Sequence, residues 1–198
     1  MKQIVIIHGG DSFSTNDAYL SYLKNFKIES VDYFKRHKGW KDTLETELGA
    51  NIEVLTPRMP NANNAKYEEW KIWFEKLIPF LTDGVLLVGH SLGGIFLVKY
   101  LSENHLPVHI DGVFLVAAPY GADTDECGEF VAPTSLSLLT EQAKRIFLYQ
   151  SEDDPIVPFT ELEKYRRALP NAEARIFKNR GHFNQETFPE IITDLKNS

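Results

Sequence analysis

Near the middle of the chain the residues run Val85-Leu86-Leu87-Val88-Gly89-His90-Ser91-Leu92-Gly93-Gly94. The apolar opening of this stretch predicts a strand that is covered on both faces, and the run Ile95–Leu101 that follows predicts a helix. Gly89 and Gly93 carry no side chains, so the strand and the helix can approach each other closely around Ser91. The stretch therefore has the strand–turn–helix order in which the G-x-S-x-G pattern exposes its serine.

Ser91 is the expected nucleophile. A serine at the tip of so sharp a turn presents its hydroxyl group outward. The helix that begins at Leu92 directs its free N–H groups toward any oxyanion formed beside that hydroxyl. A glycine-rich turn with an incidental serine would show the same five residues. The flanking strand and helix favour a nucleophile over that interpretation.

His182 is the expected general base, because a serine hydroxyl needs a base within hydrogen-bond reach at neutral pH. It lies in Arg180-Gly181-His182-Phe183-Asn184, after the last expected strand, and a loop there returns to the sheet edge that carries Ser91. His90 adjoins the serine, but neighbours across a tight turn point apart, so it is a poor base. The histidines in polar helix or loop contexts are expected to be exposed: His37, His105 and His109.

An acidic turn after the expected strand Ile146–Tyr149 supplies a carboxylate to hold the imidazole in the correct tautomer. The turn reads Ser151-Glu152-Asp153-Asp154-Pro155. Pro155 disfavours the helical region for Asp154 and keeps that residue extended, which fixes the direction of its side chain. Asp154 is therefore the expected acid, and Asp153 is the alternative. Solvation or capping of the turn accounts for the other acidic residues.

The oxyanion hole is expected to use the backbone N–H groups of Leu92 and Gly10. Gly10 belongs to His8-Gly9-Gly10-Asp11, which directly follows the expected strand Ile4–Ile7. A Gly-Gly pair after a first strand also occurs in dinucleotide-binding loops, but the G-x-G-x-x-G pattern is missing here. Neither a cofactor nor a metal ion is expected.

Short apolar runs alternate with helical patterns along the whole chain. The expected strands are Ile4–Ile7, Ile52–Thr56, Val85–Val88, Val113–Ala117, Ile146–Tyr149 and Ala174–Phe177. The expected helices are Lys41–Leu48, Tyr67–Leu81, Leu92–Asn104, Thr160–Leu169 and Pro189–Lys196. This alternation predicts one α/β domain over residues 1–198, with a mostly parallel sheet covered by helices on both faces. The expected strand order is 2-1-3-4-5-6, which brings the first loop and the Ser91 turn to one crevice.

The composition narrows the class of protein. The chain has 198 residues, 43% of them hydrophobic, and a formal net charge of −7. That charge disfavours nucleic acids and anionic membranes as partners, because both repel it. A single cysteine, Cys127, excludes an intrachain disulfide and fits a reducing compartment. No apolar run is long enough for a signal peptide or a membrane span, so a cytoplasmic location is expected.

Two long connections are expected to border the site. Residues 11–39 are expected to include an extra helix around Asp17–Asn25, and residues 119–140 are expected to form a small lid or binding loop. Asp123-Thr124-Asp125-Glu126-Cys127-Gly128 is only faintly similar to a calcium loop, since a cysteine occupies a ligand position, so a solvated acidic loop is expected. Three aromatic side chains at helical spacing are expected in the core: Trp70, Trp73 and Phe74.

These motifs occur in the order found in α/β-hydrolases, which the chain resembles over nearly its whole length. The segment Pro57-Arg58-Met59-Pro60-Asn61, followed by Trp70, is similar to a narrower group, the small serine hydrolases typified by retinoblastoma-binding protein 9. The resemblance implies a short central sheet, no large cap domain and a Ser-Asp-His triad.

The expected function is hydrolysis of a small-molecule carboxylic ester through an acyl-enzyme. Thioesters and amides stay open as substrates, because a triad does not select the leaving group. The alternative is a protein-binding module on a hydrolase scaffold with residual or regulated activity, since relatives are named for a binding partner. That alternative would make a protein the partner of this chain.

Overall fold

The computed structural model describes residues 1–35, 38–121 and 127–198. Its centre is a six-stranded sheet in the order β2-β1-β3-β4-β5-β6, in which every neighbouring pair is parallel. The strands are β1 (Lys2–Ile7), β2 (Ile52–Leu55), β3 (Val85–His90), β4 (Ile110–Val116), β5 (Ile146–Ser151) and β6 (Glu173–Phe177). The predicted α/β fold and strand order are confirmed, and the sheet is entirely parallel.

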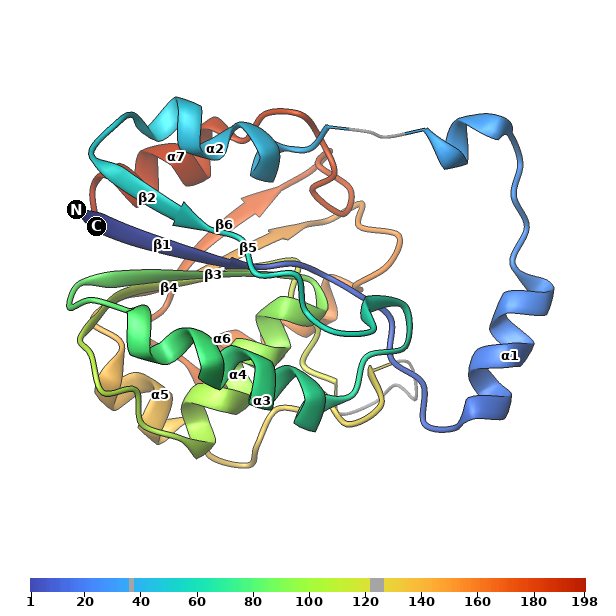
Figure 1. Ribbon diagram of the computed structural model, residues 1–198, viewed down its shortest axis with the longest axis horizontal. Coiled ribbons are helices and arrows are strands. Elements are labelled where there is room, and N and C mark those ends of the chain that lie inside the picture. The colour runs from blue at the N-terminus through green and yellow to red at the C-terminus, as the bar shows by residue number, and fades with distance from the viewer. Residues whose placement is uncertain (36–37, 122–126) are drawn as a thin grey trace.

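Helices cover both faces of the sheet, as Figure 1 shows. One face is covered by α2 (Trp40–Leu48) and α7 (Pro189–Lys196), whose apolar residues form one core cluster with the strands. The other face is covered by α3 (Tyr67–Leu77), α4 (Leu92–Glu103), α5 (Ser137–Gln142) and α6 (Thr160–Ala168). The continuous apolar runs of the inner strands follow from this arrangement, because both of their faces are buried.

The predicted helices are present, with differences that have local causes. The helix predicted at Tyr67–Leu81 ends at Leu77 and continues as a 3₁₀ turn, η3 (Ile78–Phe80), because Pro79 cannot continue an α-helix. Helix α5 begins inside the stretch predicted to be a lid loop and ends two residues beyond it, and its six residues are too few for a clear periodic pattern. Trp70 and Phe74 are fully buried as predicted, but Trp73 is 48% exposed and lies outside the core.

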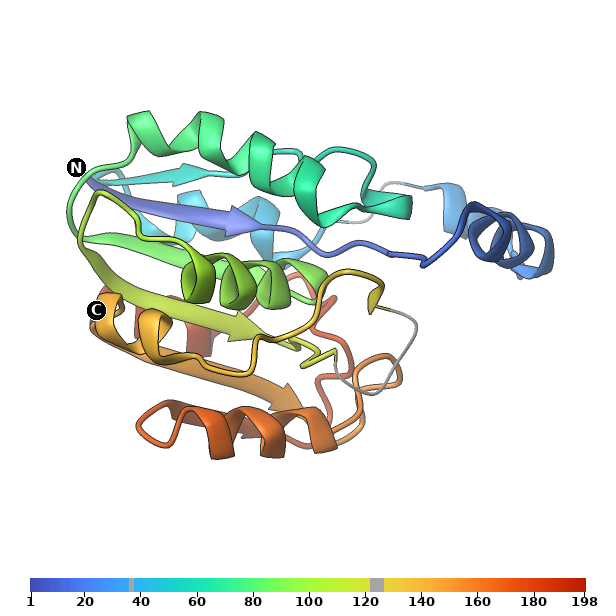
Figure 2. The ribbon, with the colours of Figure 1, turned by 90° about the horizontal axis from the view of Figure 1, so that it is seen from below.

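An extended segment projects from the body between β1 and α2. It holds the predicted extra helix, α1 (Asn16–Asn25), and a 3₁₀ turn, η1 (Val31–Phe34). Figures 1 and 2 both show these two elements standing away from the sheet and its helices. Neither α1 nor η1 has a buried residue. Among the described residues, none of the helices has the length and apolar character that a membrane crossing requires.

Candidate active site

Ser91 occupies a sharp turn between β3 and α4. Its backbone has φ 54° and ψ −124°, a conformation that residues with side chains rarely adopt. Its N–H donates to the carbonyl oxygen of Val116 on the neighbouring strand, at 2.8 Å, and its own carbonyl oxygen accepts from Gly94. A strained backbone held by bonds on both sides is typical of a functional position.

Glycine at position 89 makes this turn possible. A Cβ atom there would lie 2.5 Å from the carbonyl oxygen of Gly93, which is a severe overlap. The strand therefore meets the first turn of α4 at a distance that only glycine allows, as the spacing of the motif predicted.

The loop after β1 lies against the Ser91 turn. A Cβ atom at Gly9 would stand 3.0 Å from Cβ of Ser91, and one at Gly10 would stand 2.4 Å from the carbonyl oxygen of Ala62. The neighbouring Asp11 fixes the loop, because its N–H donates to Ala62 and its carbonyl oxygen accepts from Ala65. Within the described part of the chain, no hydrogen bond uses the N–H of Gly10 or of Leu92.

His182 and Asp154 form a buried hydrogen-bonded pair. Nδ1 of His182 lies 2.9 Å from Oδ2 and 3.1 Å from Oδ1 of Asp154, and their side chains are 7% and 0% exposed. Oδ1 of Asp154 also accepts the N–H groups of Ile156 and Val157, at 2.9 and 3.0 Å. The carboxylate is thereby fixed from two sides. No hydrogen bond among the described residues engages Nε2 of His182 or the hydroxyl of Ser91.

Asp153, the alternative acid, contacts the backbone of the His182 loop instead. Its Oδ1 accepts the N–H of Gly181 at 2.9 Å and the hydroxyl of Ser151 at 2.5 Å. The same hydroxyl oxygen accepts the N–H of Arg180. These hydrogen bonds, first that of Ser151 and then that of Gly181, lower the pKa of Asp153. Asp153 therefore connects β5 to the loop that carries His182 and makes no described contact with the imidazole.

His90 is hydrogen-bonded to the backbone of the loop that carries His182. Its Nε2 donates to the carbonyl oxygen of His182 at 2.9 Å, and its Nδ1 lies 3.1 Å from Nζ of Lys41. The ring centroids of the two histidines are 5.0 Å apart. Burial, followed by the charge of Lys41, lowers the pKa of His90 well below its usual value. A neutral His90 with its proton on Nε2 satisfies both hydrogen bonds.

The start of α2 holds the same loop. Nε1 of Trp40 donates to the carbonyl oxygen of Phe183, and the Trp40 N–H donates to that of Gln185, both at 2.9 Å. Burial lowers the pKa of Lys41, whose Nζ makes no described ion pair with a carboxylate. A half-buried cation and an indole thus fix the position of His182 from the adjacent helix.

His8 fixes the first loop in a similar way. Its Nδ1 donates to the carbonyl oxygen of Gly9 at 2.6 Å, and its Nε2 accepts the N–H of Met59 at 2.9 Å. Burial lowers the pKa of His8, and the charge of Lys41 adds to this effect. The imidazole packs edge-on against Trp70, with 5.6 Å between the ring centroids. His8 therefore connects the glycine loop to the Pro-Arg-Met-Pro segment.

A pocket of about 150 Å³ opens beside Ser91. Its described lining comes from the glycine loop, the Ser91 turn, the start of α6 and the segments around residues 119 and 157: Gly10, Asp11, Ser91, Leu92, Pro119, Cys127, Ile156, Val157, Pro158 and Glu161. Glu161 is buried and engaged, because its carboxylate accepts the N–H of Tyr120 and pairs with Lys164 at 2.6 Å. The stretch expected to be a solvated acidic loop, residues 123–128, falls largely outside the described residues, as does His37. His105 and His109 are exposed, as expected.

Comparisons with known proteins identify the family of this chain. A model described as Serine hydrolase matches residues 34–192. The chain belongs to the serine hydrolase family. Serine hydrolase RBBP9 of Rattus norvegicus is 26% identical over 160 residues, which are 80% of this chain and 83% of that protein.

Another curated relative and two solved structures are also similar to this chain. Putative hydrolase YdeN of Bacillus subtilis is 25% identical over 203 residues, covering 100% of this chain and 95% of that protein. The crystal structure of the ydeN gene product matches with a TM-score of 0.78 and 22% identity, covering 100% of this chain and 98% of that one. Est1E of Butyrivibrio proteoclasticus, solved with ferulic acid bound, matches with a TM-score of 0.59 and 13% identity, covering 100% and 87%.

The sequence patterns did not indicate Lys41 as part of the site. They also did not indicate that His8 and His90 fix the loops beside Ser91 and His182 by hydrogen bonds. A signal existed for Lys41, because it shares the inward face of its helix with Leu44 and Leu48, three and seven residues further on. No comparable signal exists for His8 or His90. Their partners are the backbone of Met59 and His182, which a periodic pattern cannot reveal.

Proposed function

We propose that this serine hydrolase cleaves carboxylic esters through an acyl-enzyme, with Ser91 as nucleophile, His182 as general base and Asp154 as the residue that orients His182. The observation that carries the proposal is the buried hydrogen bond between His182 and Asp154. Ser91, held at φ 54°, directly follows His90, whose ring donates to the backbone of His182. A carboxylate on Nδ1 keeps the proton there and leaves Nε2 free to accept one, which is what a general base requires.

The first half-reaction forms the acyl-enzyme. Nε2 of His182 takes the hydroxyl proton as Oγ of Ser91 bonds to the ester carbonyl carbon. The tetrahedral intermediate then breaks its bond to the alcohol oxygen, which receives the proton back from His182. The new bond is the ester between Oγ and the acyl group.

The second half-reaction repeats these steps with water. His182 removes a proton from water, which attacks the acyl carbon, and then returns the proton to Oγ of Ser91 as the carboxylic acid leaves. Every proton and electron pair is supplied by the protein, the ester and water. The N–H groups of Leu92 and Gly10, which have no described partner, would donate to the oxyanion in both halves.

The pocket supports a small-molecule substrate with a short acyl group, since its volume is about 150 Å³. Ferulic acid, which Est1E binds, is a carboxylic acid of the kind that ester hydrolysis releases. The proposal treats residues 1–198 as one catalytic domain, because a single sheet carries all of the groups named above. It ranks ester hydrolysis above a binding role without catalysis, because the acid and the base are paired and buried.

The test compares the wild-type chain with Ser91→Ala. A fluorophosphonate probe should label the wild type at one serine and should not label the variant. Hydrolysis of a short aryl ester should fall by roughly a million-fold in Ser91→Ala, the scale known for loss of a triad nucleophile. Thermal unfolding of both proteins serves as the control for folding. Wild-type turnover retained in a clean preparation of the variant would refute the mechanism.

A further inference from the structure

A second surface lies on the projecting segment of residues 15–35, called here the arm. It carries eight of the fourteen exposed large hydrophobic side chains found among the described residues. They are Leu20, Tyr22, Leu23, Phe26, Ile28, Val31, Tyr33 and Phe34, and the last is 71% exposed. Such a concentration in so short a segment differs from the scattered apolar residues of an ordinary surface.

The aromatic side chains of the arm form a continuous row. Starting from Phe13 at its base, ring centroids follow one another at 5.0 Å to Tyr22, 5.4 Å to Phe26, 5.3 Å to Tyr33 and 5.5 Å to Phe34. The row connects the end of α1 to η1 through the contact between Phe26 and Tyr33. Its four rings beyond Phe13 stay partly exposed in the described chain, from 37% for Tyr22 to 71% for Phe34.

The helix of the arm is too short to be stable without packing. Helix α1 has ten residues, a Thr15 cap on its N-terminus and no buried side chain. Isolated helices shorter than about 12–15 residues are marginal in water, and most helices in proteins depend on packing of an apolar face. A surface that covers this face would supply the missing stabilisation.

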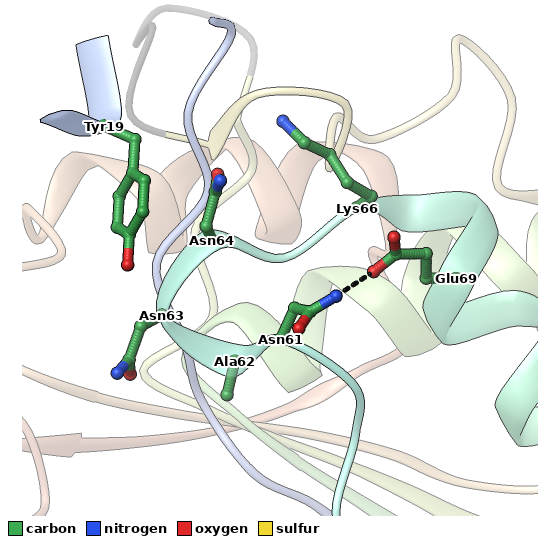
Figure 3. Close-up of a pocket in the computed structure, with 7 residues that line it drawn as sticks. All are labelled: Tyr19, Asn61, Ala62, Asn63, Asn64, Lys66 and Glu69. Atoms are coloured by element: carbon green, nitrogen blue, oxygen red, sulfur yellow. Dashed lines mark hydrogen bonds between the residues drawn. The ribbon is translucent and has the colours of Figure 1, made fainter. Parts of the chain in front are cut away.

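The body of the same chain does not provide that cover. Figure 3 shows an open pocket between the arm and the body, with Tyr19 of the arm on one side and the turn η2 (Ala62–Asn64) of the body on the other. The pocket has a volume of about 540 Å³, and its described lining beyond Tyr19 is mostly polar, including Lys66 and Glu69. The apolar side chains of the arm are not part of this lining.

We propose that the arm is the contact surface for a second copy of this chain, with arm packed on arm around a two-fold axis. The four aromatic residues alone expose roughly 400 Å², given about 200 Å² for a whole aromatic side chain. The four aliphatic residues raise the apolar area to on the order of 700 Å², close to the ~800 Å² that each partner contributes to a standard interface. A self-complementary contact buries both arms at once.

The charge distribution favours a copy of the same chain at this surface. Residues 15–35 contain three acidic residues, Asp17, Glu29 and Asp32, and three lysines, Lys24, Lys27 and Lys35, so the arm is neutral. The whole chain has a net charge of −7. The arm is thus a region where two acidic copies meet without local repulsion, whereas the overall charge opposes an anionic lipid surface.

The test measures the mass of the full chain by analytical ultracentrifugation over a series of concentrations. The wild type should form a dimer of twice the 22.6 kDa chain mass. In Val31→Asp/Phe34→Asp, whose parent residues are 70% and 71% exposed, the dissociation constant should rise by roughly thirty-fold or more. Hydrogen exchange of the α1 amides should be slowed in the dimer and fast in this variant.

A matched control changes exposed apolar residues of the body. Ile72→Asp/Phe80→Asp replaces side chains that are 57% and 71% exposed, and it should leave the dimer intact. Three results would overturn the proposal. One is a wild type that stays monomeric over the whole series, and another is equal weakening by the control. The third is a monomer whose α1 amides become protected only by neutral phosphatidylcholine vesicles, which would assign the arm to lipid.

Discussion

The ammonium group of Lys41 lies 3.1 Å from Nδ1 of His90, beneath the loop that carries His182. Because an ammonium only donates, Nδ1 must accept, and the His90 proton is confined to Nε2. That proton bonds the carbonyl oxygen of His182 at 2.9 Å. Lys41 therefore acts on the proposed base through one intervening ring and has no described contact with the pocket.

Replacing Lys41 by methionine should separate activity from stability. Lys41→Met removes a half-buried cation, so the free energy of unfolding should stay within about 1 kcal/mol of the wild type or rise. The turnover number for a short ester should fall roughly ten- to a hundred-fold, because His182 loses a support that fixes its position. Steady-state kinetics and urea unfolding of the same preparation measure both quantities.

The control for Lys41 is Lys99→Met, which removes a half-buried lysine that pairs with Glu103 on α4 at 2.9 Å. It should leave the turnover number unchanged. Equal losses of stability and activity in Lys41→Met would show that Lys41 has only a structural role. A conservative His90→Gln variant, whose amide can still donate to His182, should retain more activity than His90→Leu.

His90 should make the stability of the protein depend on pH. Its pKa is lowered in the folded state, where it faces Lys41, His8 and the His182 loop, so the unfolded chain binds the proton more readily. The free energy of unfolding should therefore be constant above about pH 6.5 and should fall as the pH drops below it. Burial of His8 acts in the same direction.

Urea unfolding at several pH values between 7.5 and 5.5 would measure this dependence. His90→Gln should reduce the slope by up to about 1.4 kcal/mol per pH unit, the contribution of one proton. A variant with the same slope as the wild type would contradict the assignment of a neutral, buried His90.

The fold could be predicted because its signals are local. The strands that pair in the centre of the sheet, β3 and β4, each contain an unbroken run of buried apolar residues, Val85–Val88 and Val113–Val116. The end of α3 at Leu77 and the exposure of Trp73 depend on Pro79 and on which part of the helix meets α4. Pro79 is a local signal that the sequence itself carries, whereas the exposure of Trp73 comes from packing, which a periodic pattern describes only in part.

The candidate site residues can be found in the sequence where a residue type and its position on the sheet coincide. Ser91, Asp154 and His182 each follow a parallel strand at the same edge, so the order of elements places them together. The supports of these residues could not be found in this way. Lys41 and His8 act through hydrogen bonds to groups about fifty residues away in the chain, and nothing in the sequence marks that pairing.

Asp154→Asn should be far more damaging to activity than Asp153→Asn. Oδ1 of Asp154 accepts two backbone N–H groups, so an asparagine there would keep its oxygen on them and direct its amide nitrogen at His182. The imidazole would then carry its proton on Nε2 and could not act as a base. The turnover number should fall by up to about 10⁴-fold, as known for triads with an amidated acid.

Asp153→Asn keeps an oxygen that can accept from Gly181 and Ser151, so its turnover number should fall by less than about tenfold. Both variants should be measured with one ester and with a fluorophosphonate probe. A larger loss in Asp153→Asn would transfer the role of triad acid to that residue.

Asp11 should make the enzyme discriminate against anionic substrates. Residues 123, 125 and 126 of the acidic loop are outside the described residues, and the carboxylate of Glu129 accepts the N–H of Tyr67. Asp11 lines the pocket beside Ser91, and no described side chain pairs with its carboxylate. Repulsion by one exposed charge is worth about 1 kcal/mol at close range, or roughly five-fold in kcat/KM.

A neutral ester and a carboxylate-bearing ester of equal length measure this effect at low salt. The neutral ester should react faster, and Asp11→Asn should narrow the ratio of the two kcat/KM values by roughly five-fold. Added salt should narrow it in the wild type as well, because the charge is exposed. Asp17→Asn, on the arm, is the matched control and should leave the ratio unchanged. A wild type that prefers the anionic ester, or a ratio that Asp11→Asn does not alter, would show that Asp11 does not govern which acyl groups enter the pocket.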